Sequence, residues 1–223
     1  MWCIPPQQNA AFVARMEAVL DLYQRPYNPL EPVLCMDESL KELQLAHYFP
    51  LQTAPGRPAR FDYLYKPVGV GTLLLCVEPL RGWRYVQVRE HRKFEDWAYF
   101  MRQVLNDFYP DATTVHLVVD NLNIHTATAF YKTFPPDEAK SLMDRITFHY
   151  TPVHGSWLNM AEIEFGVLQR QCLSQRFASR ELLSHAIQAW FTARNHLAPT
   201  INWQFTVDDA RLKLRHLYPS FDP

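Results

Sequence analysis

The sequence has little glycine, no long hydrophobic run and no excess of positive charge, and each shortage excludes a class of protein. Only 6 of the 223 residues are glycine, and none forms the glycine-rich loop with which P-loop and Rossmann enzymes hold phosphates. No apolar run approaches the ~18 residues of a membrane-spanning helix, and the opening MWCIPPQQ does not resemble a signal peptide. The net charge of −1, from 22 Lys+Arg and 23 Asp+Glu, argues against a surface that is basic throughout.

The four cysteines predict neither a disulfide framework nor a zinc site. Cys3, Cys35, Cys76 and Cys172 include no C-x-x-C pair, and none lies near a histidine at zinc-finger spacing. Cys35 and Cys76 lie inside apolar runs. We therefore expect small buried side chains in a reducing cytosol, and hence a cytoplasmic protein.

Length and composition predict a folded chain with a sizeable core. The sequence is 48% hydrophobic and 20% charged, which is not the composition of a disordered protein. Its periodicity predicts an α/β fold, in which a mixed sheet is flanked by helices. The expected helices span residues 7–23, 94–110, 126–145 (broken at the Pro135-Pro136 pair), about 156–172 and 180–195. The expected strands are residues 33–37, three segments of an antiparallel meander between residues 61 and 90, 115–120 and 146–150.

Two of these predicted strands end on an acid. Asp37 closes VLCMD and Asp120 closes HLVVD, and ligands of open α/β sheets bind beyond the carboxyl ends of the strands. Two adjacent carboxylates repel each other unless a cation lies between them, and a divalent metal is the simplest such cation. The alternative is that each aspartate opens a turn or caps a helix.

A third acid is expected near the start of the helix after residue 156. Glu162 and Glu164 are two residues apart, so they cannot share one face of a helix. Ala161 and Phe165 mark the apolar side of this helix, and Glu162 flanks it. Spacing alone does not separate a ligand from an ordinary solvated glutamate.

Three segments together resemble a known family. VLCMDE, LVVDNLNIHT and HYTPVHGSWLNMAEIEF are similar to the three catalytic blocks of mariner-type DDE transposases, especially the branch found in bacterial insertion sequences. The resemblance implies a ribonuclease H-like fold with a mixed five-stranded sheet. It also implies an N-terminal linker helix in residues 1–30 and a catalytic domain with C-terminal helices in residues 31–223.

The family's chemistry carries over to three residues. The resemblance implies that Asp37, Asp120 and Glu162 are catalytic and hold two Mg²⁺ (or Mn²⁺) ions, with Asp37 bridging both ions, Asp120 binding one and Glu162 the other. Glu164 is the fallback for the third position. The implied reaction is cleavage of double-stranded DNA at insertion-sequence ends, followed by strand transfer to target DNA at a TA dinucleotide. The implied setting is the bacterial nucleoid, and a homodimer is a further expectation.

Polar and basic residues around the acids are predicted to contact DNA. Basic residues cluster in residues 81–93 and 211–216, with a looser set at Arg57, Arg60 and Lys66. Solvated faces balanced by nearby acids are the alternative for these clusters, and a capping or core role is the alternative for the histidine of D-N-x-x-x-H. The DNA-binding candidates are Asn121, His125, His154, Asn159, Arg89, Arg92 and Lys93.

Three other interpretations stay open on the sequence. The chain is either an active transposase domain or a truncated or domesticated copy that binds DNA or a partner without transposing. A different ribonuclease H-like nuclease, such as a resolvase, would share the carboxylates but lacks W-L-N-x-x-E. A metal-free structural domain would show no stabilisation by Mg²⁺ or Mn²⁺.

Overall fold

The computed structural model describes residue 4 and residues 7–46, 56, 64–122 and 124–219. Cys3, Arg57 and Arg60 lie outside these residues. The other three cysteines are buried and free, as predicted. In the described part of the chain, no helix has the length and apolar character needed to cross a membrane.

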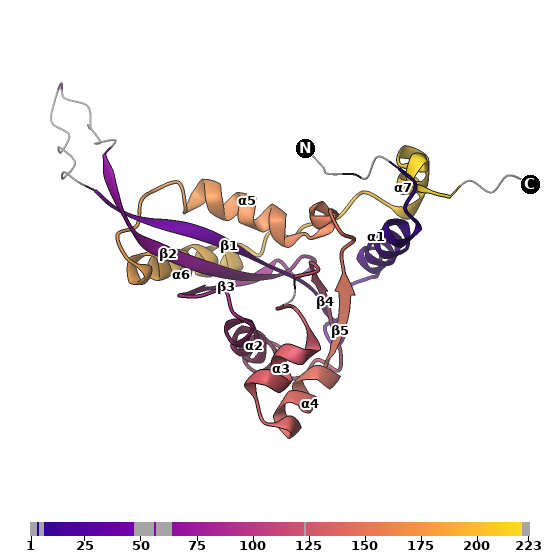
Figure 1. Ribbon diagram of the computed structural model, residues 1–223, viewed down its shortest axis with the longest axis horizontal. Coiled ribbons are helices and arrows are strands. Elements are labelled where there is room, and N and C mark those ends of the chain that lie inside the picture. Colours follow the sequence, from indigo (N-terminus) through magenta and orange to yellow (C-terminus); the bar gives the residue numbers. More distant parts are fainter. Residues whose placement is uncertain (1–3, 5–6, 47–55, 57–63, 123, 220–223) are drawn as a thin grey trace, which may run out of the picture.

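A mixed five-stranded sheet forms the centre of the fold, as predicted, with the strand order β3-β2-β1-β4-β5. The first three strands form an antiparallel meander, whereas β4 and β5 run parallel to β1. β1 is therefore the strand at which the antiparallel and parallel halves meet (Figure 1). The strands are β1 (Val33–Ala46), β2 (Tyr65–Glu78), β3 (Trp83–Arg89), β4 (Val115–Val119) and β5 (Ile146–Tyr150).

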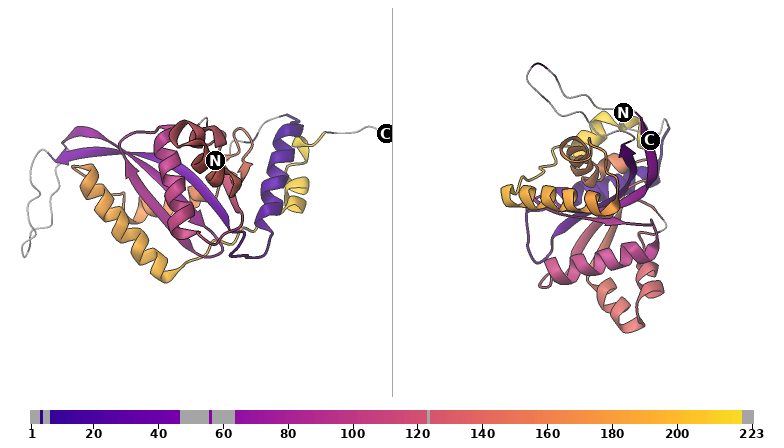
Figure 2. Two further views of the ribbon diagram at one scale, coloured as in Figure 1. Left: turned by 90° about the horizontal axis from the view of Figure 1, so that it is seen from below. Right: turned by 90° about the vertical axis from the view of Figure 1, so that its left-hand side faces the viewer.

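Helices cover both faces of this sheet (Figures 1 and 2). Successive side chains of a strand point to opposite faces, so Leu73 packs in one core with Leu168, while Leu74 packs in the other with Trp97. The first core lies under α5 (Ala161–Gln171) and α6 (Arg180–Leu197). The second lies under α2 (Phe94–Gln103), which continues into a π-helical turn at Val104–Phe108, α3 (Ala127–Thr133) and α4 (Pro136–Asp144).

The first and last helices lie side by side at one end of the molecule (Figure 1). They are α1 (Ala10–Tyr23) and α7 (Val207–Lys213), which is followed by a 3₁₀ turn at Arg215–Leu217. Met16 and Leu20 of α1 are fully buried in the same core as Leu217. α1 is thus packed against the domain, and the division predicted at residue 30 stays a prediction.

Three sequence predictions about element boundaries were wrong. β1 does not end at Asp37 but continues to Ala46, because it pairs with β2 from Cys35 to Ala46. β2 is a single strand from Tyr65 to Glu78 rather than two. The segment from Ser156 to Leu158 is a 3₁₀ turn, and the helix begins at Ala161.

Candidate functional site

The register of β1 and β4 brings Asp37 and Asp120 together. The last aligned pair of these parallel strands is Cys35 and Val118, and each aspartate lies two residues further along its own strand direction. Cys35 and Val118 belong to the core under α5. Since side chains alternate along a strand, Asp37 points to that same face. Asp120 directly follows the last residue of β4, as predicted.

Asp37 is a partly buried acid beside other acids. The pKa of its carboxyl is raised to about 7, chiefly by burial. The backbone N–H of Glu38 donates to Oδ1 over 2.8 Å and opposes this shift. The negative charges of Glu38 and Asp120 raise the pKa further. The charge of His125 lowers the pKa of Asp37, but no lysine or arginine among the described residues forms an ion pair with this acid.

Asp120 is held by hydrogen bonds on one oxygen. Its Oδ1 accepts from the backbone N–H of Leu122 over 3.0 Å and lies 2.7 Å from Nδ1 of His125. Burial raises the pKa of Asp120, but the hydrogen bond and charge of His125 outweigh it, so the pKa is lowered. Asp120 is therefore the ionised member of the pair at neutral pH.

His125 is a core residue and does not contact solvent, so the prediction that it contacts DNA was wrong. Its side chain is 0% exposed and lies between Asp120 and Glu38, with Nε2 2.7 Å from Oε2 of Glu38. Burial lowers the pKa of His125, but the hydrogen bond to Asp120 and the close contact with the charged Glu38 carboxylate outweigh burial and raise it to about 9. The alternative core role stated for this histidine is the one observed.

Glu38 and its partner Arg92 are the part of the site that sequence reasoning missed. Alternation turns Glu38 to the face opposite Asp37, where its carboxylate is 1% exposed and Arg92 Nε donates to Oε1 over 2.7 Å. The only signal in the sequence was the second acid of VLCMDE.

Asn159 anchors the segment before α5 to β1. It is 0% exposed, its Nδ2 donates to the carbonyl of Met36 over 2.8 Å, and its Oδ1 accepts from the N–H of Ala161 over 3.1 Å. Because both ends of the amide are bonded inside the protein, the prediction that Asn159 contacts DNA was wrong. It ties the start of α5 to the residue before Asp37.

The two glutamates of α5 have different surroundings. Glu164 is 0% exposed and forms ion pairs with Arg84 over 3.1 Å and with Arg194. Glu162 lies in the first turn of α5, and its side chain is exposed. Glu164, the alternative candidate for the third metal ligand, is therefore already neutralised by two arginines. Of the two glutamates, only Glu162 is exposed to solvent.

The remaining DNA-binding candidates differ in how free they are. Asn121 accepts from Arg15 over 2.6 Å and donates to the carbonyl of Thr151, and Arg89 donates to Gln87. His154 is exposed in the left-handed region at φ 65°, and Lys93 is exposed at the start of α2. The side chain of Arg92 is 41% exposed, and DNA contact by any of these five residues stays a prediction.

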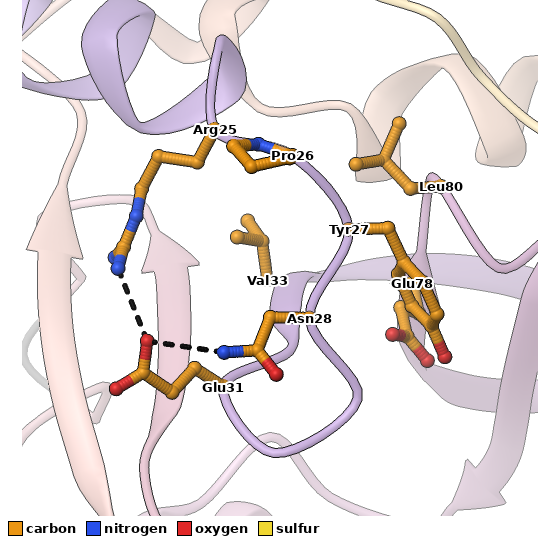
Figure 3. Close-up of a pocket in the computed structure, with 8 residues that line it drawn as sticks. All are labelled: Arg25, Pro26, Tyr27, Asn28, Glu31, Val33, Glu78 and Leu80. Carbon is orange, nitrogen blue, oxygen red and sulfur yellow. Dashed lines mark hydrogen bonds and ion pairs between the residues drawn. The ribbon is translucent and has the colours of Figure 1, made fainter.

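The carboxylate pair lies outside the cavity drawn in Figure 3. That cavity of about 160 Å³ lies where β1 begins and β2 ends. Glu31 accepts there from Arg25 over 3.2 Å and from Asn28 over 3.4 Å (Figure 3). Enclosed cavities are typical of small-ligand sites. Neither Asp37 nor Asp120 lines this cavity.

The residues present fit a hard divalent cation. The carboxylate oxygens of Asp37 and Asp120 are the ligand type that Mg²⁺ and Mn²⁺ prefer, and a cation beside Asp37 would offset the burial and the smaller repulsion that raise the pKa of this acid. In the described part of the chain, no three His, Cys, Asp or Glu side chains already surround one metal position. The structure thus brings two of the three predicted ligands together.

The raised pKa of Asp37 predicts a pH-dependent gain in stability for Asp37→Asn. The folded pKa of about 7 lies above the ordinary value of about 3.9, so the folded state binds this proton more tightly, and stability is lost progressively as the pH rises from about 4 to about 7. At pH 8 without metal, we expect the variant to be more stable by roughly 1–3 kcal/mol. In urea titrations this gain should shrink as the pH falls from 8 to 5. A variant less stable than the parent at pH 8 would contradict the burial argument.

The sheet order, the helices on both faces and the paired carboxylates define a class of protein, the ribonuclease H-like domains. The family described as DDE superfamily endonuclease matches residues 32–184. The chain belongs to this family. No curated protein matches the chain.

Solved structures with the same fold are complexes of Mos1 transposase. A pre-cleavage Mos1 transpososome has a TM-score of 0.60 at 16% identity, over 99% of this chain and 66% of that chain. A Mos1 paired-end complex with Mg has a TM-score of 0.57 at 18% identity, over 98% and 66%. A Mos1 paired-end complex with the left transposon end has a TM-score of 0.54 at 17% identity, over 88% and 62%. The chain thus spans less than two thirds of the length of the last of these.

Proposed function

We propose that this chain is the catalytic domain of a DNA transposase of the bacterial insertion-sequence branch. In this proposal it cleaves phosphodiester bonds at the ends of an insertion sequence and transfers the strands to target DNA at a TA dinucleotide. The observation that carries the proposal is that Asp37 and Asp120 each lie two residues beyond the last aligned pair of the neighbouring parallel strands β1 and β4, with no lysine or arginine partner for Asp37 among the described residues. The DDE family and the Mos1 complexes support it.

Each acid has a distinct part in this proposal. Asp37 and Asp120 each have one oxygen bonded within the protein, to Glu38 N–H and to Leu122 N–H with His125, which leaves the second oxygen of each to bind a cation. Glu162, in the exposed first turn of α5, supplies the third carboxylate ligand. Divalent ions held there would stabilise charge on the attacking and leaving oxygens of an in-line displacement.

The scaffold around the acids sets their positions. Asn159 fixes the start of α5 against β1, and Glu164 locks the same helix to Arg84 of β3 and Arg194 of α6. Glu162 is thus presented from a helix anchored at two points. The exposed Lys93, Arg92 and His154 are proposed to contact the DNA backbone, which positions DNA without reading its sequence. In this proposal the substrate is double-stranded DNA, and each active site holds two metal ions. The protein acts as a homodimer at the bacterial nucleoid.

The proposal is tested by metal-dependent cleavage. The full chain is incubated with duplex DNA carrying the ends of its own insertion sequence, in Mg²⁺, in Mn²⁺ and in EDTA. We expect 3′-OH ends at the element boundary with either metal and none in EDTA. DNA binding without cleavage in both metals would favour the non-transposing copy, and cleavage of RNA–DNA hybrids or four-way junctions instead would favour another ribonuclease H-like nuclease.

A further inference from the structure

The two carboxylate oxygens of Asp120 have different hydrogen-bonding environments. Oδ1 accepts from Leu122 N–H over 3.0 Å and lies 2.7 Å from His125 Nδ1. Oδ2 has no hydrogen-bond donor among the residues that the structure describes. The rotation of this carboxylate is therefore set by two donors on one side, of which His125 is the only side chain.

His125 is in turn held by Glu38. The imidazole is 0% exposed and packs near the ring of Trp97, with ring centroids 5.9 Å apart. Its second nitrogen, Nε2, lies 2.7 Å from Oε2 of Glu38. Nδ1 is hydrogen-bonded to Asp120 and Nε2 forms an ion pair with Glu38, so a rotation of the imidazole ring would break at least one of these contacts.

Glu38 is fixed from a third segment. Its Oε1 accepts from Arg92 Nε over 2.7 Å, and its side chain is 1% exposed. The chain of contacts runs from Arg92, before α2, to Glu38 in β1, to His125 before α3 and to Asp120 after β4. Partners of this kind orient metal ligands, and their loss typically weakens metal binding 10–100-fold.

We propose that Glu38 is a positioning residue that acts through His125 to turn one oxygen of Asp120 toward a divalent cation. This inference rests on the proposed role of Asp120 as a metal ligand. Glu38 itself points to the opposite face of the sheet from Asp37, so it acts on the site without touching the cation.

The test compares Glu38→Gln with Glu78→Gln, in the full chain. Glu78 is an equally buried acid in β2 that accepts from Tyr109 over 2.8 Å and lies outside the site. We expect Glu38→Gln to weaken Mn²⁺ binding by about 10–100-fold, measured as free Mn²⁺ by electron paramagnetic resonance, and Glu78→Gln to leave it unchanged. A second readout needs no metal: the amide resonance of Leu122, which reports the hydrogen bond to Asp120, should move in Glu38→Gln alone.

A double-mutant cycle shows whether Glu38 acts through His125. In a His125→Gln background, we expect Glu38→Gln to weaken Mn²⁺ binding no further, because the link is already broken. Additive losses, or an unchanged Leu122 amide with unchanged Mn²⁺ affinity in Glu38→Gln, would overturn the proposal. The proposed function fails separately, if the parent chain binds Mn²⁺ with the expected coupling and leaves DNA uncut.

Discussion

Replacing Glu164 with glutamine is expected to destabilise the fold by roughly 3–5 kcal/mol, the usual cost of removing one partner from a buried ion pair. The Glu164 carboxylate is fully buried between Arg84 and Arg194, and the Arg84 side chain is also 0% exposed. The guanidinium of Arg84 keeps its bonds to the carbonyls of Gly82 and Pro199. It loses the only charge of opposite sign that it contacts among the described residues.

The matched control for this prediction is Glu162→Gln, which lies two residues earlier in α5. Its side chain is exposed, and surface substitutions usually change stability by less than about 0.5 kcal/mol. Urea titrations of both variants at pH 7 without metal measure the difference. Equal stabilities for the two variants would mean that Glu164 is not the structural acid of this helix.

The second large effect is on DNA cleavage. We expect Asp37→Asn, Asp120→Asn and Glu162→Gln each to slow metal-dependent cleavage on the order of a thousandfold. Each removes a ligand from the stabilisation of transition-state charge, and a loss of about 4 kcal/mol corresponds to that factor. Single-turnover cleavage of DNA with the element's own ends measures the rates.

The controls separate chemistry from folding. Asp111→Asn and Glu181→Gln replace exposed acids elsewhere on the chain and should cleave at the parent rate. Asp37→Asn should combine lost cleavage with higher stability at pH 8, a pairing that misfolding does not produce. Cleavage by Glu162→Gln at the parent rate would remove this residue from the site.

The parts of the fold that were predictable are those with a local pattern. The continuous apolar run before Asp120 predicted a strand, and the Pro135-Pro136 pair predicted the break that the structure shows between α3 and α4. In each case a few neighbouring residues carry the information, so no long-range contact had to be known. The meander between residues 61 and 90 was predicted only in part, because two of its three expected strands are the single strand β2 and the third strand of the observed meander is β1.

The parts that were missed depend on partners far apart in the sequence. The outer half of β1 is exposed at residues such as Leu40 and Leu45, so its sequence gives a weak strand signal, and the strand is maintained by pairing with β2 and by contacts with the distant segment after α5. Glu164 belongs to the buried stripe of α5 with Ala161 and Leu168. The burial of this charged residue could not be predicted from its neighbours, because the arginines that neutralise it are 80 and 30 residues away (164 − 84 and 194 − 164).

The contacts around Asp120 illustrate the same limit. His125 is five residues from Asp120, and the motif containing both was recognised. Its other partner, Glu38, comes from a strand that only the sheet places beside it. The sequence therefore left a DNA contact and a core role for His125 both open, and the sheet decides between them.

The central claim is that Asp37 and Asp120 share a divalent cation with Glu162. Anomalous scattering from crystals of the full chain soaked in Mn²⁺ locates such an ion directly. We expect a peak between the carboxylates of Asp37 and Asp120, with Glu162 turned toward it, and no peak at this position in crystals of Asp120→Asn. A parent crystal in which Mn²⁺ binds elsewhere, with nothing between these two carboxylates, would contradict the claim.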